Sequence, residues 1–152
     1  MTDILGIDPG KRTGIALVNY TAVDVPVLMD SWDVPGGAMG FLAWVNENDW
    51  VHMRNMFIVY ERFIPREGVH GVGVDASEVT GTMLAWAQDQ GYPTVPQPAA
   101  GRMKAVPDKV LSKFHKFTGK AERNEKEAFR HVIWYLKNAK HMPTITKGWL
   151  DE

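Results

Sequence analysis

The sequence has 152 residues, of which 45% are hydrophobic and 23% are charged, and its formal net charge is −1. A chain of this length and composition can bury one sizeable core, so we expect a single globular domain over residues 1–152. It contains no cysteine, which excludes thiol chemistry, disulfide bonds and thiolate metal sites and leaves carboxylates as the expected ligands of any metal. The absence of a basic, apolar N-terminal segment and of a long apolar run predicts a cytoplasmic protein that does not enter a membrane.

The charges are unevenly distributed along the chain. Residues 101–123 carry seven basic residues against two acidic ones, a net charge of +5. Residues 1–100 carry five basic residues against twelve acidic ones, a net charge of −7. A small overall charge therefore does not exclude nucleic-acid binding, because one segment of the chain is basic while the rest is acidic.

The first half of the chain predicts an antiparallel meander, a helix and a fourth strand. Apolar runs separated by turn residues such as Pro9-Gly10 indicate strands, and the Gly36-Gly37 break indicates the start of a helix. The expected strands cover residues 4–8, 13–18, 25–34 and 56–60, and a helix near 38–50 precedes the last of them. Asp8 and Glu61 each lie at or near the end of an apolar strand.

The second half predicts one further strand among helices. Residues 64–75 have several glycines and no apolar period, which predicts a mobile loop. Asp75 and Glu78 have the spacing of a capping box for a helix that ends at Gly91. A short edge strand is expected over 94–98, followed by two helices. This order favours an α/β fold, with a mixed sheet that has helices on both faces.

Asp8 and Glu61 are the best candidates for metal ligands. Hydrolysis of a phosphodiester near neutral pH needs an activated water and stabilised charge on the phosphate, and two Mg²⁺ ions about 3.5–4 Å apart supply both. Magnesium prefers oxygen ligands, and side chains from distant sequence positions meet at the strand ends of an open sheet. The pattern therefore predicts a metal site at one edge of the sheet.

Four segments of the chain carry specific motifs. Residues 4–14 read Ile-Leu-Gly-Ile-Asp-Pro-Gly-Lys-Arg-Thr-Gly, and residues 58–63 read Ile-Val-Tyr-Glu-Arg-Phe. Residues 101–106 read Gly-Arg-Met-Lys-Ala-Val, and residues 124–131 read Asn-Glu-Lys-Glu-Ala-Phe-Arg-His. In this order they resemble the aspartate motif, the glutamate-bearing strand, the lysine segment and the closing helix of the RuvC-type Holliday junction resolvases, in particular their phage-encoded branch. The resemblance spans residues 4–137.

The resemblance implies a ribonuclease-H-like fold, in which a mixed five-stranded sheet of three antiparallel and then two parallel strands is flanked by helices. It implies an endonuclease that cleaves four-way junctions and other branched DNA, such as forks and flaps, in DNA recombination and repair. The implied cofactor is a pair of Mg²⁺ ions, or Mn²⁺, and the products carry 5′-phosphate and 3′-hydroxyl ends. Symmetric cutting of a junction needs two active sites, so a homodimer is also expected. A phage origin would place the protein in the bacterial host cytoplasm.

The third metal ligand has two candidates. Carried over by position, Asp8 and Glu61 are ligands, Glu127 takes the third-carboxylate role, and Asn124 at best orients a water. The closing helix departs from the family pattern, since Glu127 replaces the usual Asp and Asn124 the preceding His or Asp. A helical wheel instead puts Glu125 on the face turned toward the sheet and Glu127 roughly opposite. Another interpretation makes Glu127 only a capping-box partner of Asn124.

The basic segment predicts a helix that starts at Pro107-Asp108 and contacts DNA. Four of its lysines fall within about 60° of one another at about 100° per residue, opposite an apolar face. Such a stripe is typical of a rail for phosphates, although an ordinary solvated helix face has the same pattern. The lysines are Lys109, Lys113, Lys116 and Lys120. By the resemblance, Lys104 and Lys109 approach the scissile phosphate and take part in catalysis.

Further DNA contacts are expected from the first motif, the loop after Glu61 and the start of the basic segment. Phe63 and Arg66 suit a loop that wedges into an opened junction and holds phosphate, although Phe63 has an equally good interpretation as a core aromatic. The remaining expected DNA-binding residues are Lys11, Arg12 and Arg102. The five histidines form no zinc pattern, and His131 is expected to pack or to form a hydrogen bond on the last helix.

Two alternatives belong to other functional classes. The departures in the closing helix leave open a catalytically inactive module of the same fold that binds branched DNA. The sugar-kinase and actin ATPases also have a phosphate-binding hairpin with an Asp-x-Gly pattern, but they duplicate the domain. The present chain has 152 residues and no second copy of the motif, which argues against that class.

Overall fold

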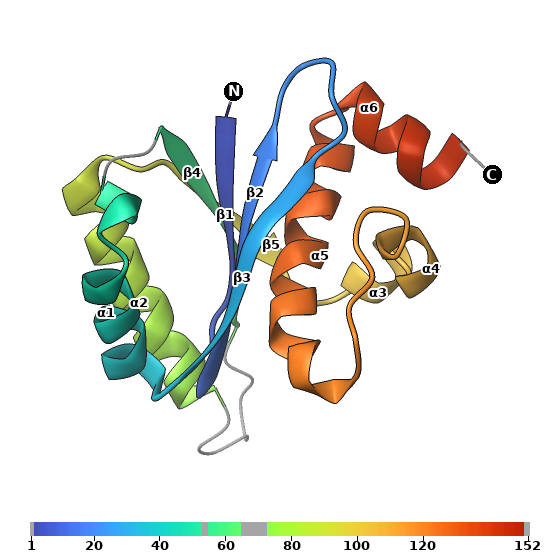
Figure 1. Cartoon of the computed structure of the whole chain (residues 1–152). Coiled ribbons are helices and arrows are strands. Elements are labelled where there is room, and N and C mark those ends of the chain that lie inside the picture. Colours follow the sequence, from blue (N-terminus) through green and yellow to red (C-terminus); the bar gives the residue numbers. More distant parts are fainter. Residues whose placement is uncertain (1, 53–54, 65–72, 151–152) are drawn as a thin grey trace.

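A computed structural model describes residues 2–52, 55–64 and 73–150 (Figure 1). It contains a five-stranded sheet with the order β3-β2-β1-β4-β5. The strands are β1 (Thr2–Asp8), β2 (Arg12–Tyr20), β3 (Val27–Pro35), β4 (Met56–Arg62) and β5 (Thr94–Pro98). The first three pair antiparallel, whereas β4 pairs parallel to β1 and β5 pairs parallel to β4. This is the predicted mixed sheet, and its edge strand at 94–98 is confirmed.

Helices cover both faces of the sheet. Figure 1 shows α1 and α2 on one side and α5 on the other. The longer helices are α1 (Gly37–Glu47), α2 (Val74–Gln90) and α5 (Arg123–Asn138), and the short ones are η1 (Asp49–His52), α3 (Arg102–Ala105), α4 (Asp108–Leu111), η2 (Lys120–Glu122), α6 (Met142–Ile145) and η3 (Thr146–Leu150). No helix in the described ranges combines the length and the apolar character that crossing a bilayer requires.

The strands divide their side chains between two cores because successive residues point to opposite faces of the sheet. On β1, Leu5 and Ile7 pack with the buried residues of α1 and α2, including Phe41 and Met83. Ile4 packs instead with the buried residues of α5. By the same alternation Gly6 and Asp8 face α5. The sheet therefore has an α1/α2 layer on one face and an α5 layer on the other.

Two glycines allow α5 to lie directly on the sheet. A Cβ atom on Gly6 would lie 2.6 Å from the carbonyl oxygen of Ala128, and one on Gly14 would lie 1.9 Å from that of Asn124. Distances this short to backbone atoms leave no room for any side chain. Gly14 is also the cross-strand partner of Asp8. The two glycines thus set the spacing between the start of α5 and the end of β1.

The prediction of a long basic helix from residue 108 is confirmed for the first turn and is wrong beyond it. The helix α4 begins at Asp108 as expected but ends at Leu111, and residues 115–118 have no regular structure. The C-terminal segment packs where the helix ends: a Cβ atom on Gly148 would meet Val110 and Phe114 at 3.2 Å, and Lys113 donates a hydrogen bond to the Gly148 carbonyl. The four lysines therefore do not form one helical stripe.

Three smaller expectations also differ from the structure. The capping box of Asp75 and Glu78 is absent, because α2 begins at Val74, and its N-cap is Gly73 in a left-handed conformation (φ 89°) without a side-chain hydrogen bond. The helix expected at 38–50 is divided into α1 and the 3-10 turn η1. The mobile loop expected at 64–75 falls mostly on residues 65–72, which lie outside the described residues.

Candidate active site

Asp8 and Glu61 lie side by side at the ends of two parallel strands. The register of β1 and β4 pairs Ile7 with Tyr60, so the next residue on each strand is one of the two carboxylates. Both point to the α5 face, since each lies two residues after one that faces this layer, Gly6 on β1 and Val59 on β4. Strand alternation and parallel register together bring the two predicted ligands to one place.

The two carboxyl groups share a proton. Burial, followed by the charge of Glu61 and a hydrogen bond with it, raises the pKa of Asp8 from 3.8 to about 8. Burial also acts to raise the pKa of Glu61, but hydrogen bonds from His131 and Asp8, with the charges of His131 and Arg102, outweigh it and lower that pKa. A protonated Asp8 therefore donates to an ionised Glu61. Two carboxylates brought together without a cation behave in this way.

Glu127 is the late glutamate that lies near this pair. Its charge contributes to the raised pKa of Asp8, and its side chain is 13% exposed. Two guanidinium groups contact it: Arg102 Nε lies 2.8 Å from Glu127 Oε2, and Arg130 Nε lies 3.3 Å from the same oxygen. The charge of Arg102 also acts on Glu61 and Asp8. The candidate site thus consists of three carboxylates and one arginine from α3.

Arg130 fastens Glu127 to the segment that carries the basic residues. Its side chain is fully buried and donates to the carbonyl of Val106 and the carboxylate of Asp108 as well as to Glu127. Lys126 forms a second ion pair with Asp108 at 3.2 Å. The first turn of α4 is therefore tied to α5 beside the candidate site. Sequence reasoning missed this role of Arg130, because its partners Val106 and Asp108 lie in another segment of the chain.

Glu125 lies over a different strand. Its Oε2 accepts a hydrogen bond of 2.9 Å from the Ser31 hydroxyl on β3, and the charges that raise its pKa, after burial, are those of Glu122, Asp33 and Asp30. The helical wheel is right that Glu125 faces the sheet. It gives the direction of a side chain but not the strand that the side chain meets, and β3 is separated from β1 by β2.

The capping interpretation of Asn124 and Glu127 is wrong. The N-cap of α5 is Glu122, and the helix has no side-chain cap hydrogen bond. Asn124 donates instead to Asp33 on β3 at 3.2 Å, and Asp33 also pairs with Arg12 at 3.0 Å. Asn124 is thus engaged on the β3 side of the helix, as Glu125 is.

His131 contacts Glu61 directly. Its Nε2 lies 3.1 Å from Glu61 Oε2, and its side chain is 0% exposed. His131 follows Glu127 by four residues on α5, a spacing that places both on one side of the helix. The expected hydrogen bond is confirmed, but its partner was not foreseen. The helical spacing from Glu127 was the available signal.

The donor set fits a divalent cation in its chemistry and only partly in its arrangement. Asp8 and Glu61 offer adjacent carboxylate oxygens, the ligands that Mg²⁺ and Mn²⁺ prefer. Among the described residues, however, no three His, Asp or Glu side chains lie close enough together to form a metal site. Arg102 and Arg130 hold the third carboxylate in ion pairs.

The expected DNA-contacting residues are mostly exposed. Lys113 binds the Gly148 carbonyl, and Phe63 is half-buried, with its ring within 2.0 Å of where a Gly73 Cβ would lie. That packing resembles the core interpretation of Phe63 more than a free wedge. Arg66 lies outside the described residues. The exposed residues are Lys11, Arg12, Lys104, Lys109, Lys113, Lys116 and Lys120.

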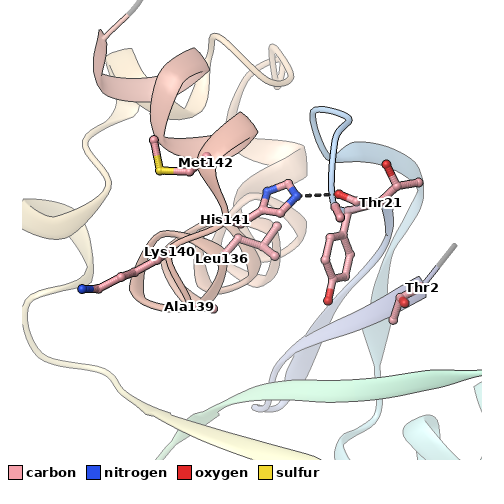
Figure 2. Close-up of a pocket in the computed structure, with 9 residues that line it drawn as sticks. Thr2, Thr21, Leu136, Ala139, Lys140, His141 and Met142 are labelled. Atoms are coloured by element: carbon pink, nitrogen blue, oxygen red, sulfur yellow. Dashed lines mark hydrogen bonds between the residues drawn. The ribbon is translucent and has the colours of Figure 1, made fainter.

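A pocket lies at the start of β1, at the other end of the strand from Asp8. Figure 2 shows this cavity of about 550 Å³, lined by residues that include Thr2 and His141. Both ring nitrogens of His141 are engaged, Nε2 with the Thr21 carbonyl at 2.6 Å and Nδ1 with the Thr144 hydroxyl at 2.7 Å. Its described lining includes no carboxylate, so it offers none of the chemistry found around Asp8.

Comparison with solved structures assigns the fold. Thermus thermophilus RuvC in complex with a Holliday junction substrate superposes with a TM-score of 0.72 at 14% identity, over 93% of this chain and 97% of that chain. A second structure of RuvC from the same organism superposes with a TM-score of 0.65 at 15% identity, over 91% of this chain and 95% of that chain. A fowlpox virus resolvase in complex with Holliday junction DNA superposes with a TM-score of 0.63 at 12% identity, over 89% of this chain and 99% of that chain. The chain has the RuvC-like ribonuclease-H fold.

Sequence comparison adds nothing to this assignment. No family model matches the chain, and no curated protein matches it. The likeness to the solved resolvases therefore lies in the fold.

Proposed function

We propose that this protein is a metal-dependent endonuclease that cleaves branched DNA, with the four-way junction as its principal substrate. The observation that carries the proposal is the juxtaposition of the Asp8 and Glu61 carboxyl groups at adjacent strand ends. The fold supports it, because two solved proteins with this fold are described as bound to Holliday junction DNA. Strand ends of an open sheet are also where α/β proteins gather their reactive groups.

In the proposed mechanism Asp8, Glu61 and Glu127 hold two Mg²⁺ ions, with Mn²⁺ as a substitute. Bound metal would supply an activated water and neutralise charge on the scissile phosphate. Asp8 would act as a ligand in its ionised form, with its proton lost to solvent. Glu127 would have to exchange its contacts with Arg102 and Arg130 for the metal, and Arg102 would then be available to a phosphate oxygen. Glu125 bonds to Ser31 on β3 and has no part in the proposed site.

Binding of the DNA is assigned to the exposed basic residues around this end of the sheet. Lys104 and Lys109 lie on α3 and α4, the segment that Arg130 ties to Glu127. Cations next to the reacting carboxylates attract the phosphate backbone and make binding depend strongly on salt. A homodimer would place two such sites on one junction and allow the symmetric cuts that resolution requires.

One observation favours a second candidate function. Glu127 is engaged by Arg102 and Arg130, and no three-ligand metal cluster is assembled within the described part of the chain. A protein that kept this arrangement on DNA would bind branched DNA without cutting it. The inactive binding module is therefore the alternative that the first experiment has to separate.

The experiment compares a labelled four-way junction, a Y-fork and a linear duplex with Mg²⁺. We expect paired symmetric nicks in the junction, and losses in Asp8→Asn, Glu61→Gln and Glu127→Gln that exceed the roughly 10–100-fold typical of residues that only support a metal ligand. Glu125→Gln is the matched control on the same helix, and it should cleave like the wild type.

Three outcomes decide between the candidates. Cleavage that survives Asp8→Asn would remove the nuclease assignment at this site. Tight junction binding without cleavage in Mg²⁺ or Mn²⁺ would establish the binding module. A loss in Glu125→Gln, with Glu127→Gln active, would exchange the two glutamates in the proposed site.

A further inference from the structure

We infer that His131 is a positioning residue, which holds the carboxylate of Glu61 beside Asp8 in the orientation that binds a divalent cation. This inference rests on the proposed function. It concerns a residue outside the carboxylate set, and the contact between the His131 ring and Glu61 carries it.

The imidazole is held rigidly on the α5 side of the sheet. Its side chain is 0% exposed, and its ring stacks on Trp134 with centroids 6.0 Å apart and planes 28° from parallel. The neighbouring helix residues Val132 and Ile133 are fully buried as well. A ring in this position cannot turn away from Glu61 without opening the α5 layer. The hydrogen bond of 3.1 Å therefore fixes Glu61 Oε2 against a rigid donor.

The surroundings of the ring indicate which nitrogen carries the hydrogen. Nδ1 of His131 is buried and has no hydrogen-bond partner within the described chain. A hydrogen on Nδ1 would be a buried donor without an acceptor, which costs about 1–3 kcal/mol, and it would leave a bare Nε2 facing a carboxylate. A hydrogen on Nε2, which faces Glu61 Oε2, gives the carboxylate a donor. His131 is thus a donor to Glu61, and carboxylates that bind metal are commonly oriented by such hydrogen bonds.

The two glutamates of the site show what the donor achieves. Arg102 attracts both, since its charge acts on Glu61 and on Glu127. Glu127 has no imidazole donor among the partners described for it, and Arg102 binds it at 2.8 Å. Glu61, held by His131, stays in hydrogen-bond contact with Asp8. His131 thereby keeps one carboxylate available to a cation while the other is engaged by arginine.

A purely structural role for His131 makes a different prediction from a positioning role. Filling the α5 layer requires only volume, whereas positioning Glu61 requires an N–H group at the end of the side chain. His131→Leu retains most of the apolar volume and removes the donor. His131→Gln retains a terminal N–H donor on a flexible chain. The two variants therefore separate packing from donation.

The test measures Mn²⁺ and Mg²⁺ binding to the full-length protein without DNA by isothermal titration calorimetry, together with the Mg²⁺ concentration that gives half-maximal junction cleavage. We expect His131→Leu to weaken metal binding about 10–100-fold, the range for groups that orient a ligand, and to raise the half-maximal Mg²⁺ concentration to match. His131→Gln should restore most of the affinity. Junction binding in EDTA should be unchanged in both variants.

His115→Leu is the control variant. His115 is exposed and its ring contacts Phe117 and Phe129 of the same layer, with centroids 4.5 and 6.5 Å away, but its described ring contacts include no carboxylate. It should leave the metal affinity unchanged. A further readout without metal is the ¹⁵N NMR signal of the His131 ring, which should show the tautomer protonated at Nε2.

The outcomes distinguish this inference from the proposed function. Wild-type metal affinity in His131→Leu, with only a lower melting temperature, would show a structural role and overturn the inference while the nuclease stands. A ring protonated at Nδ1 would overturn it as well. Failure of the wild type to bind either metal would overturn the proposed function, and the inference with it.

Discussion

The two faces of the sheet are built from the same strands but hold different chemistry. The α1/α2 layer is apolar and rich in aromatic rings: Trp32 packs edge-on to Trp44 at 5.2 Å and stacks with Trp50 at 5.6 Å. The α5 layer contains two fully buried polar side chains, Arg130 and His131, beside its apolar residues. Asp8 and Glu61 face this second layer, and Glu127 lies on its helix α5.

The difference shows how one strand serves both stability and chemistry. Tyr60 and Glu61 are neighbours on β4, yet Tyr60 packs in the α1/α2 layer and Glu61 meets His131 in the α5 layer. Apolar burial stabilises by roughly 25 cal/mol per Å² without direction, whereas buried polar groups require defined partners. The α1/α2 layer can therefore carry stability, while the α5 layer fixes the position of charged groups.

The largest expected effect breaks the close approach of α5. Gly14→Ala would place a methyl group 1.9 Å from the Asn124 carbonyl oxygen, and a backbone atom cannot move aside as a flexible side chain does. We expect a loss of about 3 kcal/mol, the upper part of the range for overpacking, measured by urea unfolding. Gly81→Ala on α2, with nothing within 4 Å, is the control and should stabilise by up to about 1 kcal/mol. Equal stability of both variants would contradict the tight α5 packing.

The next effect removes the buried charge of the α5 layer. Arg130→Met deletes the contacts with Glu127, Asp108 and the Val106 carbonyl. Breaking a buried ion pair typically costs 3–5 kcal/mol, but Glu127 keeps Arg102 and Asp108 keeps Lys126, so we expect about 2–3 kcal/mol. Urea unfolding measures it. Met83→Leu in the α1/α2 layer should lose less than about 1.5 kcal/mol. A fully stable Arg130→Met would show that this layer tolerates an apolar substitute.

The smallest effect depends on pH. Folding raises the pKa of Asp8 from 3.8 to about 8, so the folded protein holds a proton that the unfolded chain has lost, and stability without metal falls as the pH rises through this window. Asp8→Asn keeps a donor to Glu61 and cannot ionise. In EDTA it should match the wild type near pH 4 and melt a few degrees higher at pH 8, which corresponds to roughly 1–2 kcal/mol.

Thermal unfolding across this pH range provides the measurement. Glu47→Gln, at an exposed carboxyl at the end of α1, is the control and should follow the wild-type curve. A wild-type melting temperature that rises from pH 5 to 8 in EDTA would contradict the shared proton. Added Mg²⁺ should reduce the difference between wild type and Asp8→Asn, because a bound ligand stabilises only the protein that binds it.

The sequence predicts the sheet and the positions of Asp8 and Glu61 at strand ends. Apolar runs indicate strands, and a polar residue after such a run indicates the end of a strand. Asp8 and Glu61 follow from this rule alone. The choice between Glu125 and Glu127 does not, since helical periodicity gives an angle around α5 but not the strand beneath it. Ser31, the partner of Glu125, lies 94 residues away in the chain.

The lysine stripe fails for a related reason. Local periodicity assumes that a helix continues, but α4 ends where the C-terminal segment packs on Val110 and Phe114. Long-range contacts of this kind leave no local signal at residues 108–120. The buried Arg130 and the donor His131 were likewise hidden, because their partners Asp108 and Glu61 become neighbours only in the folded chain.

The glycines beneath α5 bear on how variants of this protein are interpreted. Gly6 and Gly14 have no side chain that could bind a metal, yet each allows the helix that carries Glu127 to lie close to the strands beside Asp8. A random-mutagenesis screen for loss of cleavage would therefore recover substitutions at these glycines alongside those at the carboxylates. The inactive clones would separate into two groups in a melting assay: the carboxylate variants fold normally, and the glycine variants do not.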